Sequence, residues 1–202
     1  MKIILASGSP RRIQLLKEWG VTYTVRPSGA DEETALVRPS AIVTCLALRK
    51  AVSVAKETGE GLVIGADTIV VLKGEIIGKP VDPADALRIL RNLNGSWHRV
   101  YTGIAVVDAA TGTSRVDYEV SRVKMRRFSE QELSLLAGKH MDKAGAYAVQ
   151  EQDDAFVERI EGDYFNVVGL PYGTLQQLLL PFKIRLLKAQ RNRYDKTQRM
   201  CS

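Results

Sequence analysis

The sequence predicts an α/β fold built on a bent, mixed β-sheet with flanking helices. Helical and strand-like segments mix along the 202 residues without the strict alternation of a regular doubly wound sheet. Hydrophobic residues make up 45% of the chain, which is enough for a sizeable core. No repeat, low-complexity block or linker rich in proline and glycine divides the sequence, so we expect one domain over residues 1–182 and a basic C-terminal tail over 183–202.

The first part of the chain predicts two strands and two helices. The apolar run from Ile3 to Ala6 is typical of a buried strand, and the helix that follows it ends at Gly20. The residues before Pro27 have strand composition, and Pro39 begins a long helix whose apolar residues recur at helical spacing. In order, these elements span residues 3–6, 10–19, 21–25 and 39–58.

The middle of the chain predicts a strand-rich region with one helix. An apolar strand that contains Asp67 turns at Lys73 and Gly74 into a short partner, which is a hairpin pattern. A helix begins at Pro83 and ends before Asn94, and two long strands then flank a turn. In order, these elements span residues 62–72, 76–77, 83–93, 98–108 and 114–127.

The last third predicts a helix, a pair of strands and a final helix. Ser129 and Glu132 have the spacing of a capping box, which marks the start of the first helix. The residues around Gly162 predict a hairpin turn between the two strands. In order, these elements span residues 129–137, 155–160, 164–168 and 172–180.

The segment from Ser7 to Arg12 is the most informative part of the sequence for function. An apolar strand stops there at small, hydroxyl-bearing residues, and Ser9 and Pro10 suit the N-cap and the first position of a helix. Backbone N–H groups at a helix start favour an anion, and Arg11 and Arg12 add two forks of donors for a polyphosphate. The alternative is a strand-to-helix turn with two solvated arginines, and this segment alone does not decide between them.

Asp67 interrupts an otherwise apolar strand, where an unpaired carboxylate would cost several kcal/mol. A divalent metal, a lysine or an exposed position in a cleft would compensate its charge, and backbone N–H groups are the structural alternative. Glu32 lies in the acidic run from Asp31 to Glu33, which is typical of a solubilising loop. If the run binds a metal instead, Asp67 is the candidate second carboxylate.

Two lysines and one glutamine complete the candidate residues. Lys79 lies between Gly78 and Pro80, a constrained turn that aims its ammonium group, and Lys50 lies on the helix after the acidic loop. For either lysine alone, a solvated surface charge is the ordinary interpretation. The amide of Gln150 can donate and accept hydrogen bonds, as a uracil or thymine edge requires, although the end of a core strand is the simpler explanation.

The remaining composition argues against several function classes. Much of the net charge of +6 lies after Pro181, so we expect a solvated tail and no nucleic-acid binding. His98 and His140 lack metal-ligand spacing, and the serines lack a nucleophile-elbow pattern. No apolar run approaches the roughly 20 residues of a membrane span, and the N-terminus lacks a secretory pattern, so we expect a cytoplasmic protein without a membrane partner.

Six short motifs, taken in their order along the chain, resemble the Maf family. The match covers about residues 3–180, nearly the whole expected domain, and the combination is specific although several pieces alone are not. Ala30 is a small departure, because a larger apolar residue usually precedes the acidic pair. The motifs are Ser7–Arg12, Asp31–Glu33, Ala66–Thr68, Gly78–Pro80, Tyr101–Gly103 and Gly169–Pro171.

This resemblance implies a nucleoside triphosphate pyrophosphatase with two lobes around a deep cleft, which uses Mg²⁺ or Mn²⁺ and forms a homodimer. The segment from Asp142 to Gln150 resembles the branch that hydrolyses dTTP and UTP in nucleotide-pool housecleaning, with Gln150 as the discriminating position. CTP and modified pyrimidine nucleotides stay open as further substrates. The rival interpretation is a nucleotide-binding regulator of septum formation or cell division without significant turnover.

The resemblance also implies a mechanism, in which water attacks the α-phosphorus and releases a nucleoside monophosphate and pyrophosphate. Glu32 and Asp67 would hold the metal, and Asp67 would also orient or deprotonate the water. The arginines and lysines would bind the phosphates, and Gln150 with Ser9 would hold the base or a nearby phosphate. The expected catalytic residues are Asp67, Glu32 and Lys79. The expected substrate-binding residues are Ser9, Arg11, Arg12, Lys50 and Gln150.

Overall fold

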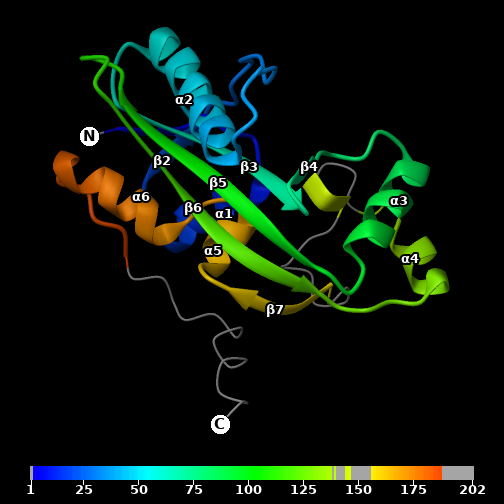
Figure 1. Cartoon of the computed structure of the whole chain (residues 1–202). Helices are drawn as coiled ribbons and strands as arrows, with labels where there is room; N and C mark the ends of the chain where they lie inside the picture. Colours follow the sequence, from blue (N-terminus) through cyan, green and yellow to red (C-terminus); the bar gives the residue numbers. More distant parts are fainter. Residues whose placement is uncertain (1, 138, 140–143, 147–155, 188–202) are drawn as a thin grey trace.

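A seven-stranded mixed β-sheet organises the fold (Figure 1). Its strands are β1 (Ile3–Leu5), β2 (Tyr23–Val25), β3 (Leu62–Leu72), β4 (Glu75–Ile77), β5 (Trp97–Asp108), β6 (Ser114–Met125) and β7 (Val157–Glu161). They lie in the order β2-β1-β3-β5-β6-β7, with β4 paired to the end of β3. β1 is parallel to β2 and β3, and the other pairings are antiparallel. The computed structural model describes residues 2–137, 139, 144–146 and 156–187.

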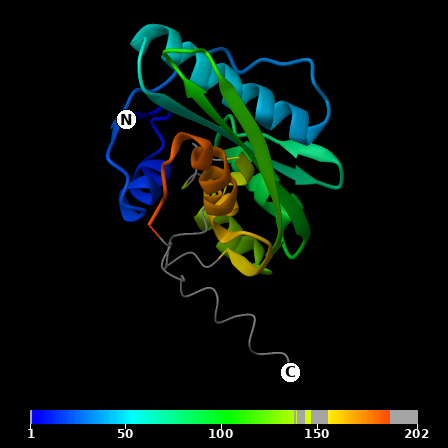
Figure 2. The same ribbon diagram turned by 90° about the vertical axis from the view of Figure 1, so that its left-hand side faces the viewer.

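Helices cover both faces of the sheet and its far end. They are α1 (Pro10–Glu18), α2 (Pro39–Thr58), α3 (Pro83–Leu93), α4 (Glu130–Leu136), α5 (Tyr164–Val168) and α6 (Tyr172–Leu179), with the 3₁₀ turns η1 (Ala144–Ala146) and η2 (Leu180–Phe182). α2 lies on one face, and α1, α5 and α6 cover the other (Figures 1 and 2). α3 and α4 pack together at the far end. Across the described residues, no helix combines the length and apolar character needed to cross a bilayer.

Three clusters of buried apolar side chains hold these layers together. One lies beneath α2 around Ala51, and a second lies on the opposite face around Leu16 and Trp19. The third joins α3, α4 and the ends of the long strands around Leu90 and Phe156. Because β3 contributes residues to clusters at both ends, it links two lobes. The structure therefore confirms the predicted bent, mixed α/β fold.

One predicted strand is wrong, because residues 164–168 form helix α5. The side chain of Asp163 accepts a hydrogen bond from the Phe165 N–H at 2.8 Å, which caps the helix start. Gly169 ends the helix in the left-handed region with φ 110°. These two caps outweigh the strand preference of the β-branched residues between them, and β7 pairs with β6 instead of with this segment.

The first residues of the predicted solvated tail pack against the domain. Leu186 is buried, and its N–H donates to the Gln176 side chain at 2.7 Å. The next residue, Leu187, donates its N–H to the Trp19 carbonyl oxygen at 2.9 Å. The expectation of a solvated segment from residue 183 onward is therefore wrong for Ile184 and Leu186, since both side chains pack into the cluster around Leu16 and Trp19.

Candidate active site

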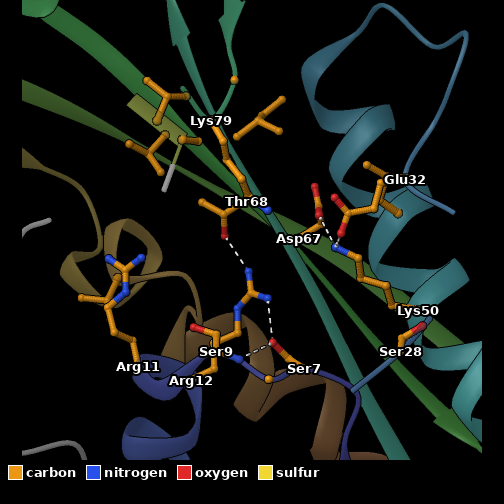
Figure 3. Close-up of a pocket in the computed structure, with 18 of the residues that line it drawn as sticks. Ser7, Ser9, Arg11, Arg12, Ser28, Glu32, Lys50, Asp67, Thr68 and Lys79 are labelled. Carbon is orange, nitrogen blue, oxygen red and sulfur yellow. Dashed lines mark hydrogen bonds and ion pairs between the residues drawn. The ribbon is translucent and has the colours of Figure 1, made fainter. Parts of the chain in front are cut away.

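A cavity of about 830 Å³ lies between the two lobes, and most of the predicted site residues line it. This volume is typical of a small-molecule site. Its walls come from the turn after β1, the acidic loop, α2, the middle of β3 and the turn after β4. Figure 3 shows charged side chains from all these segments around one hollow. The predicted site residues that line it are Ser9, Arg11, Arg12, Glu32, Lys50, Asp67 and Lys79.

The turn between β1 and α1 forms one wall. Pro10 occupies the first helical turn, as the sequence predicts, and no acidic residue lies in that turn. Ser9 is the N-cap residue of α1, as predicted, and its carbonyl oxygen accepts from the Ile13 N–H at 3.1 Å, but its side chain makes no capping hydrogen bond. Instead the Ser9 N–H donates to Ser7 Oγ at 3.3 Å, and the turn is held by its own hydroxyl groups.

Arg12 points from α1 into the protein wall of the cavity (Figure 3). Its Nε donates to the Gly169 carbonyl oxygen at 2.8 Å, and Nη1 donates to Ser7 Oγ and to the Ala66 carbonyl oxygen at 3.1 and 3.0 Å. Nη2 donates to Thr68 Oγ1 at 3.0 Å. Burial lowers the pKa of Arg12 to about 10, and the nearby Asp67 partly offsets this effect. The guanidinium is therefore still charged at neutral pH.

Lys50 joins the two predicted metal ligands. Its Nζ lies 2.7 Å from Asp67 Oδ1 and 2.7 Å from Glu32 Oε1. Asp67 is 8% exposed, so the lysine supplies the compensation that a buried carboxylate requires. The hydrogen bond from Lys50 is the main reason why the pKa of Glu32 lies below its usual range. A lysine was one of the three compensations that the sequence predicted for Asp67, and the structure confirms it.

Two glycines bring Lys50 close to Asp67, because they let α2 rest directly on the sheet. A Cβ atom at Gly65 would lie 2.2 Å from the Ala47 carbonyl oxygen, and a Cβ at Gly103 would lie 2.3 Å from the Val43 carbonyl oxygen. Any side chain at either position would force the helix away from β3 and β5.

Arg49 is a site residue that sequence reasoning missed. Its Nη1 donates to the carbonyl oxygens of Asp31 and Glu33, at 2.9 and 2.7 Å. These two residues flank Glu32, so Arg49 holds the loop backbone while its neighbour Lys50 holds the Glu32 carboxylate. The only sequence signal is that Arg49 adjoins Lys50, and this does not reveal a contact with a loop 16 residues upstream.

Lys79 reaches the cavity from the turn after β4 (Figure 3). The Gly145 N–H donates to the Gly78 carbonyl oxygen at 3.2 Å, which ties this turn to η1. Ala144 lines the same cavity, so the start of the segment predicted to recognise the base lies beside Lys79. Gln150 itself lies outside the described residues.

Residues 2–182 match the model of the Maf-like protein family. The chain belongs to the Maf family. Among its relatives, a protein from Elusimicrobium minutum named dTTP/UTP pyrophosphatase is 48% identical over 182 residues, which is 90% of this chain and 99% of that protein. A dTTP/UTP pyrophosphatase from Acetivibrio thermocellus is 46% identical over 198 residues, 93% of this chain and 98% of that protein.

The Maf chain also resembles a solved structure, that of the Staphylococcus aureus Ham1 protein. The TM-score is 0.52 at 16% sequence identity, and the alignment covers 91% of this chain and all of that one. At this level of identity the likeness shows a shared fold. It agrees with the mixed sheet and two-lobed arrangement of the Maf structure described above.

The carboxylates of the Maf site fit a magnesium ion. One carboxylate oxygen of Glu32 and one of Asp67 point toward the same place, where the Lys50 ammonium contacts both. Mg²⁺ binds through one or two carboxylates together with substrate phosphates and water, so this donor set suits it. In the described part of the chain, no group of three or more His, Cys, Asp or Glu side chains is arranged to hold a metal.

Proposed function

We propose that this Maf protein hydrolyses dTTP and UTP to the nucleoside monophosphate and pyrophosphate. The observation that carries the proposal is the convergence of four cationic and two anionic side chains on one cavity between the lobes. Their net charge of +2 complements a triphosphate, because clefts lined by one sign of charge concentrate ligands of the opposite sign. The names of the relatives from E. minutum and A. thermocellus give the reaction and the pyrimidine preference.

The lining of the cavity combines charged and apolar side chains, as a nucleotide site requires. Arg11, Arg12, Lys50 and Lys79 supply positive charge for the phosphates, and Ser7 and Ser9 of the turn after β1 add hydroxyl groups. The apolar part of the lining suits the faces of a base. It includes Val70, Ile77, Val100, Ala144 and Val167.

In this proposal the charged residues of the cavity supply binding and charge stabilisation. Arg11, Arg12, Lys50 and Lys79 bind the phosphates and stabilise the negative charge that develops as the bond to pyrophosphate breaks. Asp67 orients a water molecule against the α-phosphorus and accepts its proton.

A divalent ion completes the proposed site. Glu32 and Asp67 would hold Mg²⁺ or Mn²⁺, and the bound ion would neutralise phosphate charge. The hydrogen bonds from Lys50 to both carboxylates keep them converged on one point. We place base recognition on Gln150, with Ser9 beside the phosphates, and CTP and modified pyrimidine nucleotides among the candidate substrates.

We further propose that the enzyme works in the cytoplasm as a homodimer, with residues 1–182 as the catalytic domain and the basic residues after 182 as an extension outside the reaction. The packing of Ile184 and Leu186 into the cluster around Leu16 and Trp19, with the hydrogen bond from the Leu187 N–H to the Trp19 carbonyl oxygen, supports a structural role for the start of this extension.

The deciding experiment is a screen of the purified protein against normal and modified nucleoside triphosphates with Mg²⁺ or Mn²⁺, measuring released pyrophosphate. We expect dTTP and UTP to exceed the purine nucleotides. Hydrolysis in ¹⁸O-labelled water should place the label in the monophosphate, which locates the attack at the α-phosphorus. Tight binding of dTTP and UTP without pyrophosphate release would reject the enzymatic proposal in favour of a nucleotide-binding regulator.

A further inference from the structure

A closed ring of hydrogen bonds links the cavity wall to the buried side of the sheet. The Arg12 guanidinium donates through Nη2 to Thr68 Oγ1 at 3.0 Å, and Thr68 Oγ1 lies 3.0 Å from Thr102 Oγ1. The Thr102 hydroxyl donates to the Asn166 carbonyl oxygen at 2.9 Å. The Gly169 N–H donates to that same carbonyl at 3.0 Å, and the Gly169 carbonyl accepts from Arg12 Nε at 2.8 Å.

The chemistry of the donors fixes the direction of every bond in this polar ring. Thr102 gives its one hydroxyl proton to the Asn166 carbonyl, so it can only accept from Thr68. Thr68 then has no proton left and must accept from Arg12, which as a guanidinium can only donate. The reverse orientation would set two acceptors against each other in a buried place, which is costly.

The far side of the polar ring is rigid. Thr102 and Asn166 are fully buried, and the Asn166 amide donates to the Val100 carbonyl oxygen at 3.0 Å and to Ser121 Oγ at 2.9 Å. These bonds fix α5 to β5 and β6. Gly169 must lack a side chain here, because its φ is +110° and a Cβ would lie 3.2 Å from Thr68 Oγ1.

We infer that Thr102 is a positioning residue for the reaction, acting through Thr68 on the guanidinium of Arg12. Thr102 does not line the cavity, whereas Thr68 and Arg12 do. Among the described residues, four of the five N–H groups of Arg12 have protein acceptors, which leaves one on Nη2 for a phosphate oxygen. The Thr68 bond to that same nitrogen helps to hold the guanidinium plane, and the orientation of this plane sets the direction of the last N–H. That the ligand is a phosphate depends on the proposed function, whereas the polar ring is a feature of the structure itself.

The test compares Thr102→Val, which keeps the shape and removes the hydroxyl, with Thr102→Ser, which restores it. We expect Thr102→Val to raise the Kd for dTTP and for inorganic tripolyphosphate, measured without metal, by roughly fivefold. The KM for dTTP should rise with it, and Thr102→Ser should return both to within about twofold of the wild type. Thr58→Val is the matched control, because the Thr58 hydroxyl bonds only within α2, to the Val54 and Ala55 carbonyls, among the described contacts.

A double-mutant cycle separates positioning from general damage. In an Arg12→Lys background the Thr102→Val change should have no further effect, because one ammonium cannot close the ring. An equal loss in that background, or an unchanged Kd in Thr102→Val, overturns the inference. If Thr102→Val does not fold, Thr68→Val removes the hydroxyl that links Thr102 to Arg12. The same double-mutant cycle with Arg12→Lys then provides the test. Wild-type binding without pyrophosphate release would reject the proposed function while the Kd comparison still tests the ring.

Discussion

Asp67 of β3 stands directly opposite Gly103 of β5 in the register of the sheet. α2 crosses above this pair so closely that a Cβ on Gly103 would lie 2.3 Å from the Val43 carbonyl oxygen. The same helix carries Lys50, whose ammonium lies 2.7 Å from Asp67. The absence of a side chain at position 103 therefore sets the distance between a helix and the carboxylate on which the proposed chemistry depends.

Gly103→Ala should consequently impair the site and the fold together. The added methyl group must push α2 outward, and overpacking of this kind costs about 1–3 kcal/mol of stability. We expect a lower melting temperature and at least a tenfold loss of kcat/KM, since a misplacement of about 1 Å in a site is enough for such a loss. Gly173→Ala is the control, because nothing lies within 4 Å of a Cβ there. Full activity in Gly103→Ala would contradict this account of helix placement.

Asp67→Asn should remove turnover while the fold persists. The amide keeps the size of the side chain but cannot take a proton from water, and loss of a general base lowers kcat by about 10²–10⁴-fold. The measurements are pyrophosphate release and the circular dichroism melting curve. Asp117→Asn, on the exposed part of β6, makes the same chemical change away from the cavity and should behave as the wild type. An unchanged kcat in Asp67→Asn would remove the proposed role.

Sequence reasoning could predict the elements whose signal is local. The capping box at Ser129 appears where expected, and α2 has the predicted bounds, Pro39–Thr58. Asp67 stood out because a carboxylate in an apolar strand needs a partner, and Lys50 is that partner. α5 was missed because its N-cap residue, Asp163, lies next to Gly162 in a segment that also fits a hairpin turn.

The parts that sequence reasoning missed depend on contacts between distant segments. Thr68 and Thr102 are 34 residues apart, and only the pairing of β3 with β5 places their hydroxyls 3.0 Å apart. Two adjacent arginines suggest two equivalent phosphate ligands, yet most N–H groups of Arg12 donate to protein acceptors. Arg12 and Arg49 both donate to backbone carbonyl oxygens. Every residue type has a carbonyl group, so the sequence does not indicate these contacts.

Arg49→Ala should weaken metal binding without removing a metal ligand. Arg49 holds the carbonyls on both sides of Glu32, so its loss frees the loop and misplaces that carboxylate. Loss of a residue that orients a ligand lowers metal affinity by about 10–100-fold. We expect the Mg²⁺ concentration for half-maximal activity to rise by about tenfold, with kcat recovered at saturation, and Mn²⁺ titration followed by electron paramagnetic resonance to show the same shift.

The control for this effect is Arg88→Ala, which removes an exposed arginine that pairs with Asp85 within α3. It should leave the metal requirement unchanged. Arg49→Lys should recover part of the metal affinity, because an ammonium nitrogen has three N–H donors and can serve both carbonyls, as the single Nη1 nitrogen of Arg49 does. A normal Mg²⁺ requirement in Arg49→Ala would show that Lys50 alone positions Glu32.

His98 should make the protein less stable as the pH falls below neutral. It lies in β5 with 3% exposure, and burial lowers its pKa to about 4 from an ordinary value of 6.5. Between these two values the unfolded chain binds a proton that the folded chain does not, so the free energy of unfolding falls as the pH decreases from 6.5 to about 4. The shift corresponds to a loss of about 3 kcal/mol across that window.

The measurement is urea unfolding at several pH values for the wild type and for His98→Gln. Carboxylates also titrate in the lower part of this range, so the informative quantity is the difference between the two proteins and not the slope of either one. That difference should be constant above pH 7 and should change by about 3 kcal/mol in favour of the variant between pH 6.5 and 4. A constant offset over the whole range would show that His98 binds its proton as readily in the folded protein as in the unfolded chain, and would contradict the lowered pKa.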